Sequence, residues 1–168
     1  MKKLLKVCII PILILSFFSF NSSNAEAFHS SKTTSTEKAF VKIKSGTLTV
    51  RSGEGTKYKK IGSLKKGAEV AVYSTDNFSG WSKIKYKGKK AYVATKYIKF
   101  ADPFAWSPGI KKEFEDAMVK YYVDSKDTLR YKKNGIYNNQ GQYSVYGEVD
   151  GVEMYIVGVN VKSGWYHG

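Results

Sequence analysis

The sequence has 168 residues, and its 28 Lys/Arg against 14 Asp/Glu give a net charge of +14. The single cysteine, Cys8, lies in an N-terminal segment that we expect to be removed, so the rest of the chain has no disulfide, thiol nucleophile or thiolate ligand. Two histidines, His29 and His167, are too few for the usual zinc site and poorly placed for the base of a Ser-His-Asp triad. We expect no metal and no cofactor.

Residues 1–27 have the pattern of a secretory signal peptide. A basic start precedes an apolar run at residues 7–20, and small residues stand at Ala25 and Ala27. The run is shorter than the ~20 residues that span a bilayer, so we expect export and no stable membrane span after cleavage. Cleavage fits after either alanine, and the Ala-Glu-Ala pattern favours Ala27.

Charge divides the remaining chain into two parts. Residues 28–37 are rich in Ser and Thr, which is typical of a flexible spacer. Residues 38–99 then contain 16 Lys/Arg and 3 Asp/Glu, a net charge of +13, whereas residues 103–168 contain 8 of each. A polycationic surface attracts polyanions, and for an exported protein we expect anionic wall polymer such as teichoic acid rather than nucleic acid.

Residues 38–100 have the pattern of a small all-β barrel, with short alternating runs separated by glycine turns. Leu48 and Val50 are expected inside the barrel, and Thr49 and Arg51 on its surface. Ile61 is a further core candidate. The predicted strands are residues 39–44, 47–51, 60–64, 68–74, 81–86 and 89–93.

Several stretches of this region resemble the bacterial SH3 domain. They are Gly46-Thr-Leu-Thr-Val-Arg-Ser-Gly53, Tyr58-Lys-Lys-Ile-Gly-Ser-Leu-Lys-Lys-Gly67, Gly80-Trp-Ser-Lys-Ile84 and Gly88-Lys-Lys-Ala-Tyr-Val93, with Tyr97-Ile98 closing. The resemblance implies an SH3-like barrel. It also implies attachment to peptidoglycan through an extended groove that takes peptide stems or cross-bridges.

The resemblance also suggests where a ligand binds. We expect Glu54 to meet a peptide amine and the aromatic side chains to pack on the peptide, although Trp81 could instead cap the barrel and Arg51 could be structural. The sequence departs from the family pattern at Thr49, at Glu54-Gly55 and at Ala91, where Asn, Pro-Ser and Gly are usual. The candidate ligand-binding residues are Thr49, Glu54, Tyr58, Trp81 and Tyr92.

Residues 103–168 predict a small α+β unit. Ser107 as N-cap and Pro108 at the first helical position predict a helix over residues 108–123. Asp150-Gly151 is a type I′ hairpin signal, so we expect a three-stranded antiparallel sheet. Its strands are residues 143–149, 152–161 and 165–167, and their ending is weakly similar to PepSY-type modules.

The function expected from these observations is binding to the cell wall, without catalysis. Two alternatives stay open. In one, residues 103–168 bind or inhibit an exported protein, and in the other the chain is an accessory wall-modifying enzyme. Glu148 and Glu153 face each other across the predicted hairpin, but opposed surface acids without a deep cleft do not suggest glycoside hydrolysis.

Overall fold

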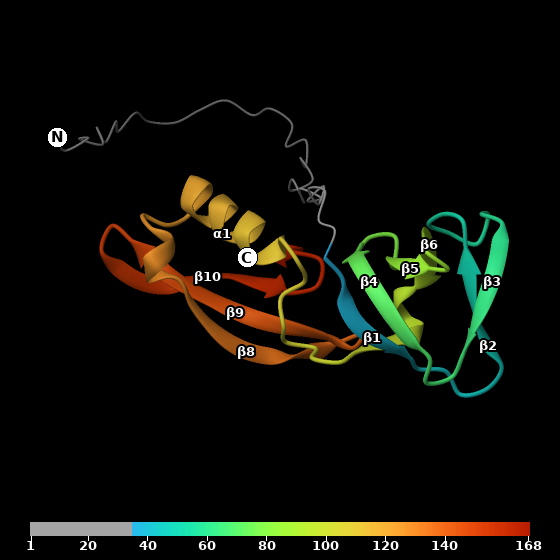
Figure 1. Ribbon diagram of the computed structural model, residues 1–168. Coiled ribbons are helices and arrows are strands. Elements are labelled where there is room, and N and C mark those ends of the chain that lie inside the picture. Colours follow the sequence, from blue (N-terminus) through green and yellow to red (C-terminus); the bar gives the residue numbers. More distant parts are fainter. Residues whose placement is uncertain (1–34) are drawn as a thin grey trace, which may run out of the picture.

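The computed structural model describes residues 35–168, which form two units side by side (Figure 1). The predictions for the signal peptide, for His29 and for most of the spacer lie outside the described residues. The front unit is a barrel of antiparallel strands and the second is one long helix on a sheet, so the predicted fold class is confirmed. Within residues 35–168 no helix is long and apolar enough to cross a membrane.

All six strands predicted for the barrel are present, within a few residues of their predicted ends. β1 begins at Glu37, inside the range assigned to the spacer, and a seventh strand pairs with it. The sheet order is β3-β2-β6-β5-β4-β1-β7. Its elements are β1 (Glu37–Val41), β2 (Thr47–Arg51), β3 (Lys60–Lys65), β4 (Glu69–Thr75), β5 (Trp81–Tyr86), β6 (Lys89–Ala94), a 3-10 helix η1 (Thr95–Tyr97) and β7 (Ile98–Phe100).

The alternation of inward-facing and outward-facing residues along the strands explains the barrel core and shows why the prediction that Ile61 is buried is wrong. Leu48 and Val50 are buried as expected, but Ile61 is 42% exposed. In the β2–β3 ladder Val50 lies opposite Gly62, so Gly62 faces inward and Ile61 faces solvent. A side chain at Gly62 would overlap the Tyr86 ring, which fills that part of the barrel wall.

The second unit has a four-stranded sheet, so the prediction of three strands is wrong. Strand β8 was missed because its residues are nearly all exposed and mostly polar, which leaves no apolar period to read. The Asp150-Gly151 hairpin is confirmed, with φ of 53° and 77°. The sheet order is β11-β10-β9-β8. The elements are α1 (Ile110–Tyr121), a 3-10 helix η2 (Lys126–Thr128), β8 (Arg130–Tyr137), β9 (Gln140–Val149), β10 (Val152–Asn160) and β11 (Tyr166–His167).

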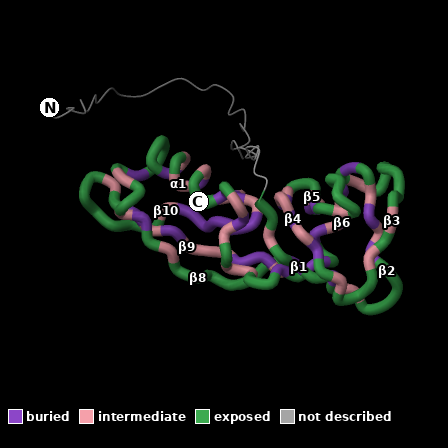
Figure 2. The backbone as a smooth tube through the Cα atoms, in the orientation of Figure 1, coloured by how far each residue is buried: buried purple, intermediate pink, exposed green. Residues whose placement is uncertain are grey.

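Helix α1 packs its apolar side against one face of this sheet. Phe114 and Met118 are fully buried with Val145 and Val157, and Figure 2 shows buried residues along β9 and in the second half of β10. The predicted N-cap is wrong, because the residue before the helix is Gly109, with a φ of 84° and no side-chain cap. The hydroxyl of Ser107 donates to the Glu37 carboxylate instead, at 2.8 Å.

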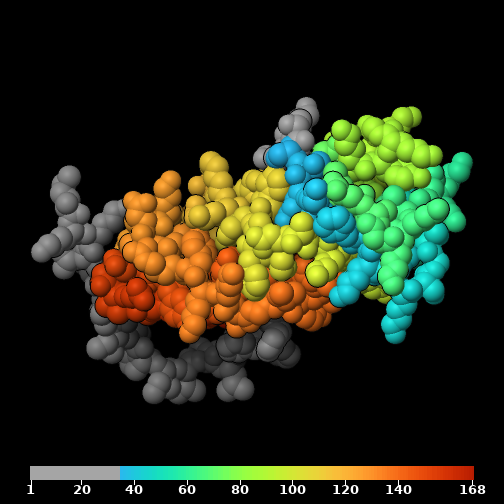
Figure 3. Space-filling model, turned by 60° about the horizontal axis from the view of Figure 1, so that its bottom comes forward, coloured from blue at the N-terminus to red at the C-terminus, as the bar shows by residue number. Residues whose placement is uncertain are grey.

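The two units are joined by a buried charge. Lys162 is completely inaccessible, and its ammonium group pairs with Glu37 of β1 and donates to the carbonyl oxygens of Asp102 at 2.7 Å and Ala105 at 2.5 Å. Burial lowers the Lys162 pKa, while the Glu37 carboxylate acts in the opposite direction. Because these partners come from β1 and from the connecting segment, Lys162 holds the second unit against the barrel. Figure 3 shows the two units packed against each other.

Candidate functional site

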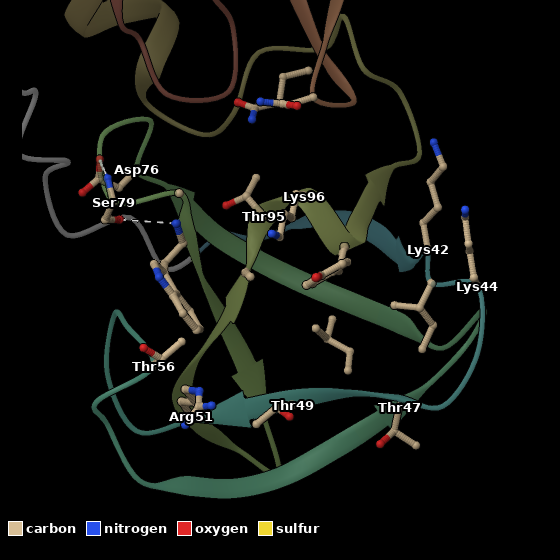
Figure 4. Close-up of a pocket in the computed structure, with 18 of the residues that line it drawn as sticks. Lys42, Lys44, Thr47, Thr49, Arg51, Thr56, Asp76, Ser79, Thr95 and Lys96 are labelled. Carbon is tan, nitrogen blue, oxygen red and sulfur yellow. Dashed lines mark hydrogen bonds between the residues drawn. The ribbon is translucent and has the colours of Figure 1, made fainter.

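A groove with a volume of about 1260 Å³ lies between the barrel and the turn that joins β8 to β9. One wall is the outer face of β2, where Thr47, Thr49 and Arg51 alternate with the buried core residues (Figure 4). The opposite side carries Thr95 and Lys96 of η1. The inward–outward alternation predicted for β2 therefore gives this strand its groove-facing side chains.

The groove is cationic. It is lined by Lys42, Lys44, Arg51, Lys66 and Lys96, and Asp76 is the single acidic residue among its lining side chains. The Asp76 carboxylate is already engaged, because it accepts the backbone N–H groups of Phe78 at 2.8 Å and Ser79 at 3.3 Å. The field in the groove therefore favours an anionic ligand.

Arg51 has a structural contact as well as a place in the groove. Its guanidinium donates to the Tyr58 carbonyl oxygen at 2.8 Å, which ties the loop after β2 to the strand. Arg51 also lies opposite Tyr92 in the β2–β6 pairing. Arg51 therefore connects the groove to the neighbouring surface.

Two of the five predicted ligand-binding residues, Thr49 and Trp81, line the groove. Trp81 is half-buried, and its backbone N–H donates to the Ser79 hydroxyl at 3.3 Å. It occupies the outer face of β5, opposite Ala94 of β6, which lines the groove too. Trp81 therefore lies outside the buried barrel core.

The other three predicted residues, Glu54, Tyr58 and Tyr92, lie next to the groove and not in it. The Tyr92 pKa is raised, first by burial and then by the negative charge of Glu54 and by Tyr58, which places the three side chains near one another. The Tyr58 ring covers Gly53, where a Cβ atom would lie 2.5 Å from the ring. Tyr92 lies opposite Arg51, which lines the groove. The cluster of Glu54, Tyr58 and Tyr92 is therefore next to the groove on the outer face of the barrel.

The second unit supplies a wall of the groove that the sequence reasoning missed. Asn138 and Gln140, at the tip of the β8–β9 hairpin, line the groove together with the barrel residues. Gln140 is 3% exposed, and its buried Oε1 atom has no hydrogen-bond partner. The only sequence signal was Asn138-Asn139, a pair suited to a tight turn, with φ of 49° and 63° in the structure.

Asn139 fastens this hairpin tip to the barrel. Its side-chain amide donates to the Ile98 carbonyl oxygen at 3.2 Å and accepts from the Lys42 ammonium at 3.0 Å. The tip therefore meets the barrel beside the groove, at the same end of the sheet as Lys162, since the neighbouring Val161 donates its N–H to the Gly141 carbonyl oxygen. We call this pair of hydrogen bonds the Asn139 contact.

The described residues offer little for metal or acid–base chemistry. In residues 35–168 no group of three or more His, Cys, Asp or Glu side chains is placed to hold a metal ion. Glu148 and Glu153 are paired across the β9–β10 hairpin as predicted, but both are exposed and neither lines the groove. The groove itself is built from cations, hydroxyls and amides, which suit binding.

Comparison with known proteins gives the front unit a family. Residues 46–99 match the family described as bacterial SH3 domain. The chain is 38% identical over 78 residues to a probable endopeptidase p60 of Listeria innocua, covering 46% of this chain and 16% of that protein. It is 39% identical over 51 residues to a putative N-acetylmuramoyl-L-alanine amidase, YrvJ, of Bacillus subtilis, covering 30% and 10%. The chain thus spans less than a fifth of the length of these relatives.

Proposed function

Because residues 46–99 are a bacterial SH3 domain, we propose that this protein is exported and binds the bacterial cell wall through the groove on that domain. The relatives that share the domain are named as a peptidase and an amidase, and a domain common to both supports a role in wall attachment. The observation that carries the proposal is the open cationic groove on the matched domain.

We propose that the ligand is a peptide of peptidoglycan. Hydroxyl groups of Thr47, Thr49 and Thr56 line the groove and can donate to peptide carbonyl groups, and Trp81 offers an apolar surface. Beyond Arg51, the Tyr58 and Tyr92 rings would pack on peptide side chains, and Glu54 would meet an amine. A peptide longer than the groove would reach this cluster.

The lysines add a second, less specific contribution. The net charge of +13 on residues 38–99 attracts phosphate-rich polymer such as teichoic acid, and this attraction weakens as salt screens it. Localisation in the wall or outside the cell follows from the expected signal peptide. Binding without catalysis is the role we propose for the groove, whose one carboxylate accepts two backbone N–H groups through Oδ1.

Co-sedimentation with purified walls tests the proposal. The protein from residue 28 onward is mixed with walls before and after removal of teichoic acid, at low and high salt. A variant with two groove lysines replaced, K44Q/K96Q, is compared with K85Q/K90Q, whose exposed lysines are paired on β5 and β6 outside the groove and which loses the same charge. We expect K44Q/K96Q to bind at least about fivefold more weakly than the control, the effect of losing charge-assisted hydrogen bonds.

The outcomes separate the components of the proposal. Wall binding that survives stripping and salt supports a peptide site. Equal losses in both double variants would reduce the groove to general polycation adhesion, and no binding by the parent protein would overturn the proposal. Export is checked by mass spectrometry of secreted protein, which also decides between cleavage after Ala25 and after Ala27.

A further inference from the structure

The groove belongs to both units of the protein. The matched domain ends at residue 99, yet Asn138 and Gln140 of the second unit line the groove with Lys42, Lys96 and the β2 threonines. We infer that the β8–β9 hairpin is part of the ligand site and that the ligand there is a carboxylate-bearing peptide. This inference rests on the proposed wall-binding function and gives the second unit a direct role in it.

The hairpin is held in place before any ligand arrives. The Asn139 contact joins its tip to Ile98 and Lys42, and the buried Lys162–Glu37 pair joins the segment after β10, at the same end of the sheet, to β1. These two attachments, on adjacent strands, restrain the second unit against rotation better than either one alone. The wall formed by Asn138 and Gln140 is therefore preorganised, which lowers the entropy cost of binding.

Gln140 indicates what this wall recognises. A buried acceptor with no partner costs free energy, and the Oε1 atom of Gln140, a residue that lines the groove, is such an acceptor. A ligand N–H group would satisfy it after a small adjustment of the side chain. The lysines of the groove instead favour negatively charged acceptors. A peptide with a free carboxylate supplies both the N–H donor for Gln140 and the negative charge for the lysines.

An N–H donor distinguishes this ligand from a purely phosphate polymer. Phosphate groups would satisfy Lys42, Lys44 and Lys96 but offer no N–H to Gln140. A peptide amide does, so an unsubstituted phosphate polymer fits the lysines alone. The carboxylate and the phosphate are two sources of the same anionic chemistry, and they are separated by the choice of probe.

The test uses the protein from residue 28 onward with its hairpin altered. N139G removes both hydrogen bonds of the Asn139 contact and keeps a residue suited to a φ of 63°. Q140L removes the unpaired acceptor at similar volume. The control D150G makes the corresponding turn substitution at the β9–β10 hairpin, which does not line the groove.

Binding is measured to teichoic-acid-free walls, to a soluble wall peptide with a free carboxylate and to the same peptide amidated. We expect Q140L to weaken binding about tenfold, the effect of one hydrogen bond lost to the ligand, and N139G to weaken it because the hairpin is no longer held in place, whereas D150G binds like the parent. We also expect the parent protein to bind the amidated peptide more weakly than the peptide with a free carboxylate. Thermal unfolding of each variant is recorded, and chemical-shift changes at the Asn138 and Gln140 side-chain amides give a readout in the unaltered protein.

Failure of this inference differs from failure of the proposed function. If the parent binds walls and K44Q/K96Q weakens binding, while N139G and Q140L bind normally and the two amide signals do not move, the hairpin is no part of the site. If the parent binds only walls that retain teichoic acid, the peptide ligand is wrong. If it binds neither walls nor peptide, the proposed function itself is overturned.

Discussion

Lys162 is a charged residue without solvent exposure, and its partners define what its removal would do. K162M would leave the Glu37 carboxylate, whose side chain is 12% exposed, without its counter-charge and would free two carbonyl oxygens. Breaking a buried ion pair by removing one partner costs about 3–5 kcal/mol, and we expect a loss of this size in the free energy of unfolding.

Urea titration followed by tryptophan fluorescence measures this loss. The matched double variant E37Q/K162M removes both charges, so we expect it to recover part of the stability. The Ser107 hydroxyl can still bond to the new amide, which helps that recovery. A K162M protein as stable as the parent would show that the ion pair contributes nothing to the joint.

Tyr131 makes the stability of the second unit depend on alkaline pH. Its phenol donates to Glu115 at 2.9 Å, and burial together with that carboxylate raises the Tyr131 pKa far above the ordinary value near 10. The folded state therefore keeps the proton above pH 10, where the unfolded chain loses it. The stabilising contribution is complete below pH 10 and falls as the pH rises above it.

The substitution Y131F removes this dependence. We expect it to cost about 1 kcal/mol near neutral pH, from the lost hydrogen bond, and to flatten the fall in unfolding free energy between pH 10 and 11. Tyr137, which is 66% exposed, gives the control Y137F. Equal pH slopes for the parent and Y131F would contradict the assignment.

At the scale of elements, the segment that connects the two units packs directly against the backbone of β9. Gly141 donates to the Pro103 carbonyl oxygen at 2.7 Å, and a Cβ atom there would lie 2.6 Å from that oxygen and 2.7 Å from the Phe104 ring. We expect G141A to reduce the free energy of unfolding by about 1–3 kcal/mol through overpacking.

A glycine on the neighbouring strand provides the control for G141A. A Cβ atom at Gly158 of β10 would meet His167 at 3.5 Å, an ordinary contact. Since glycine weakens a strand interior, we expect G158A to be neutral or slightly stabilising in the same urea titration. Destabilisation of equal size in both variants would show that close approach of the connecting segment is not the cause.

The elements that sequence alone predicted are those with strong local signals. The barrel strands have apolar alternation between glycine turns, and Asp150-Gly151 marks a hairpin whatever surrounds it. Strand β8 was missed because its stability comes from pairing with β9, and Ser107 was assigned to the helix because its partner, Glu37, is 70 residues away. Such tertiary contacts leave no mark in local sequence.

At the scale of the whole molecule, the candidate site was only partly predictable. Alternation on β2 and the family resemblance led to Thr49 and Trp81, which do line the groove. Asn138 and Gln140 belong to the second unit and approach the barrel only because the two units are docked. No pattern within either unit predicts how it meets the other.

The Glu37–Lys162 pair joins residues 125 positions apart, and this sets an order of events in time. The barrel ladders connect residues within 37–100 and can close early, whereas the pair must wait until the whole second unit has folded. In stopped-flow refolding we expect Trp81 to report a fast phase and Trp106 and Trp165 a slower one. In K162M the final docking step should lose its amplitude, whereas a single common phase would mean that both units assemble together. Because β1 gains its ion pair from Lys162, the two units become fixed to each other only at the end of folding.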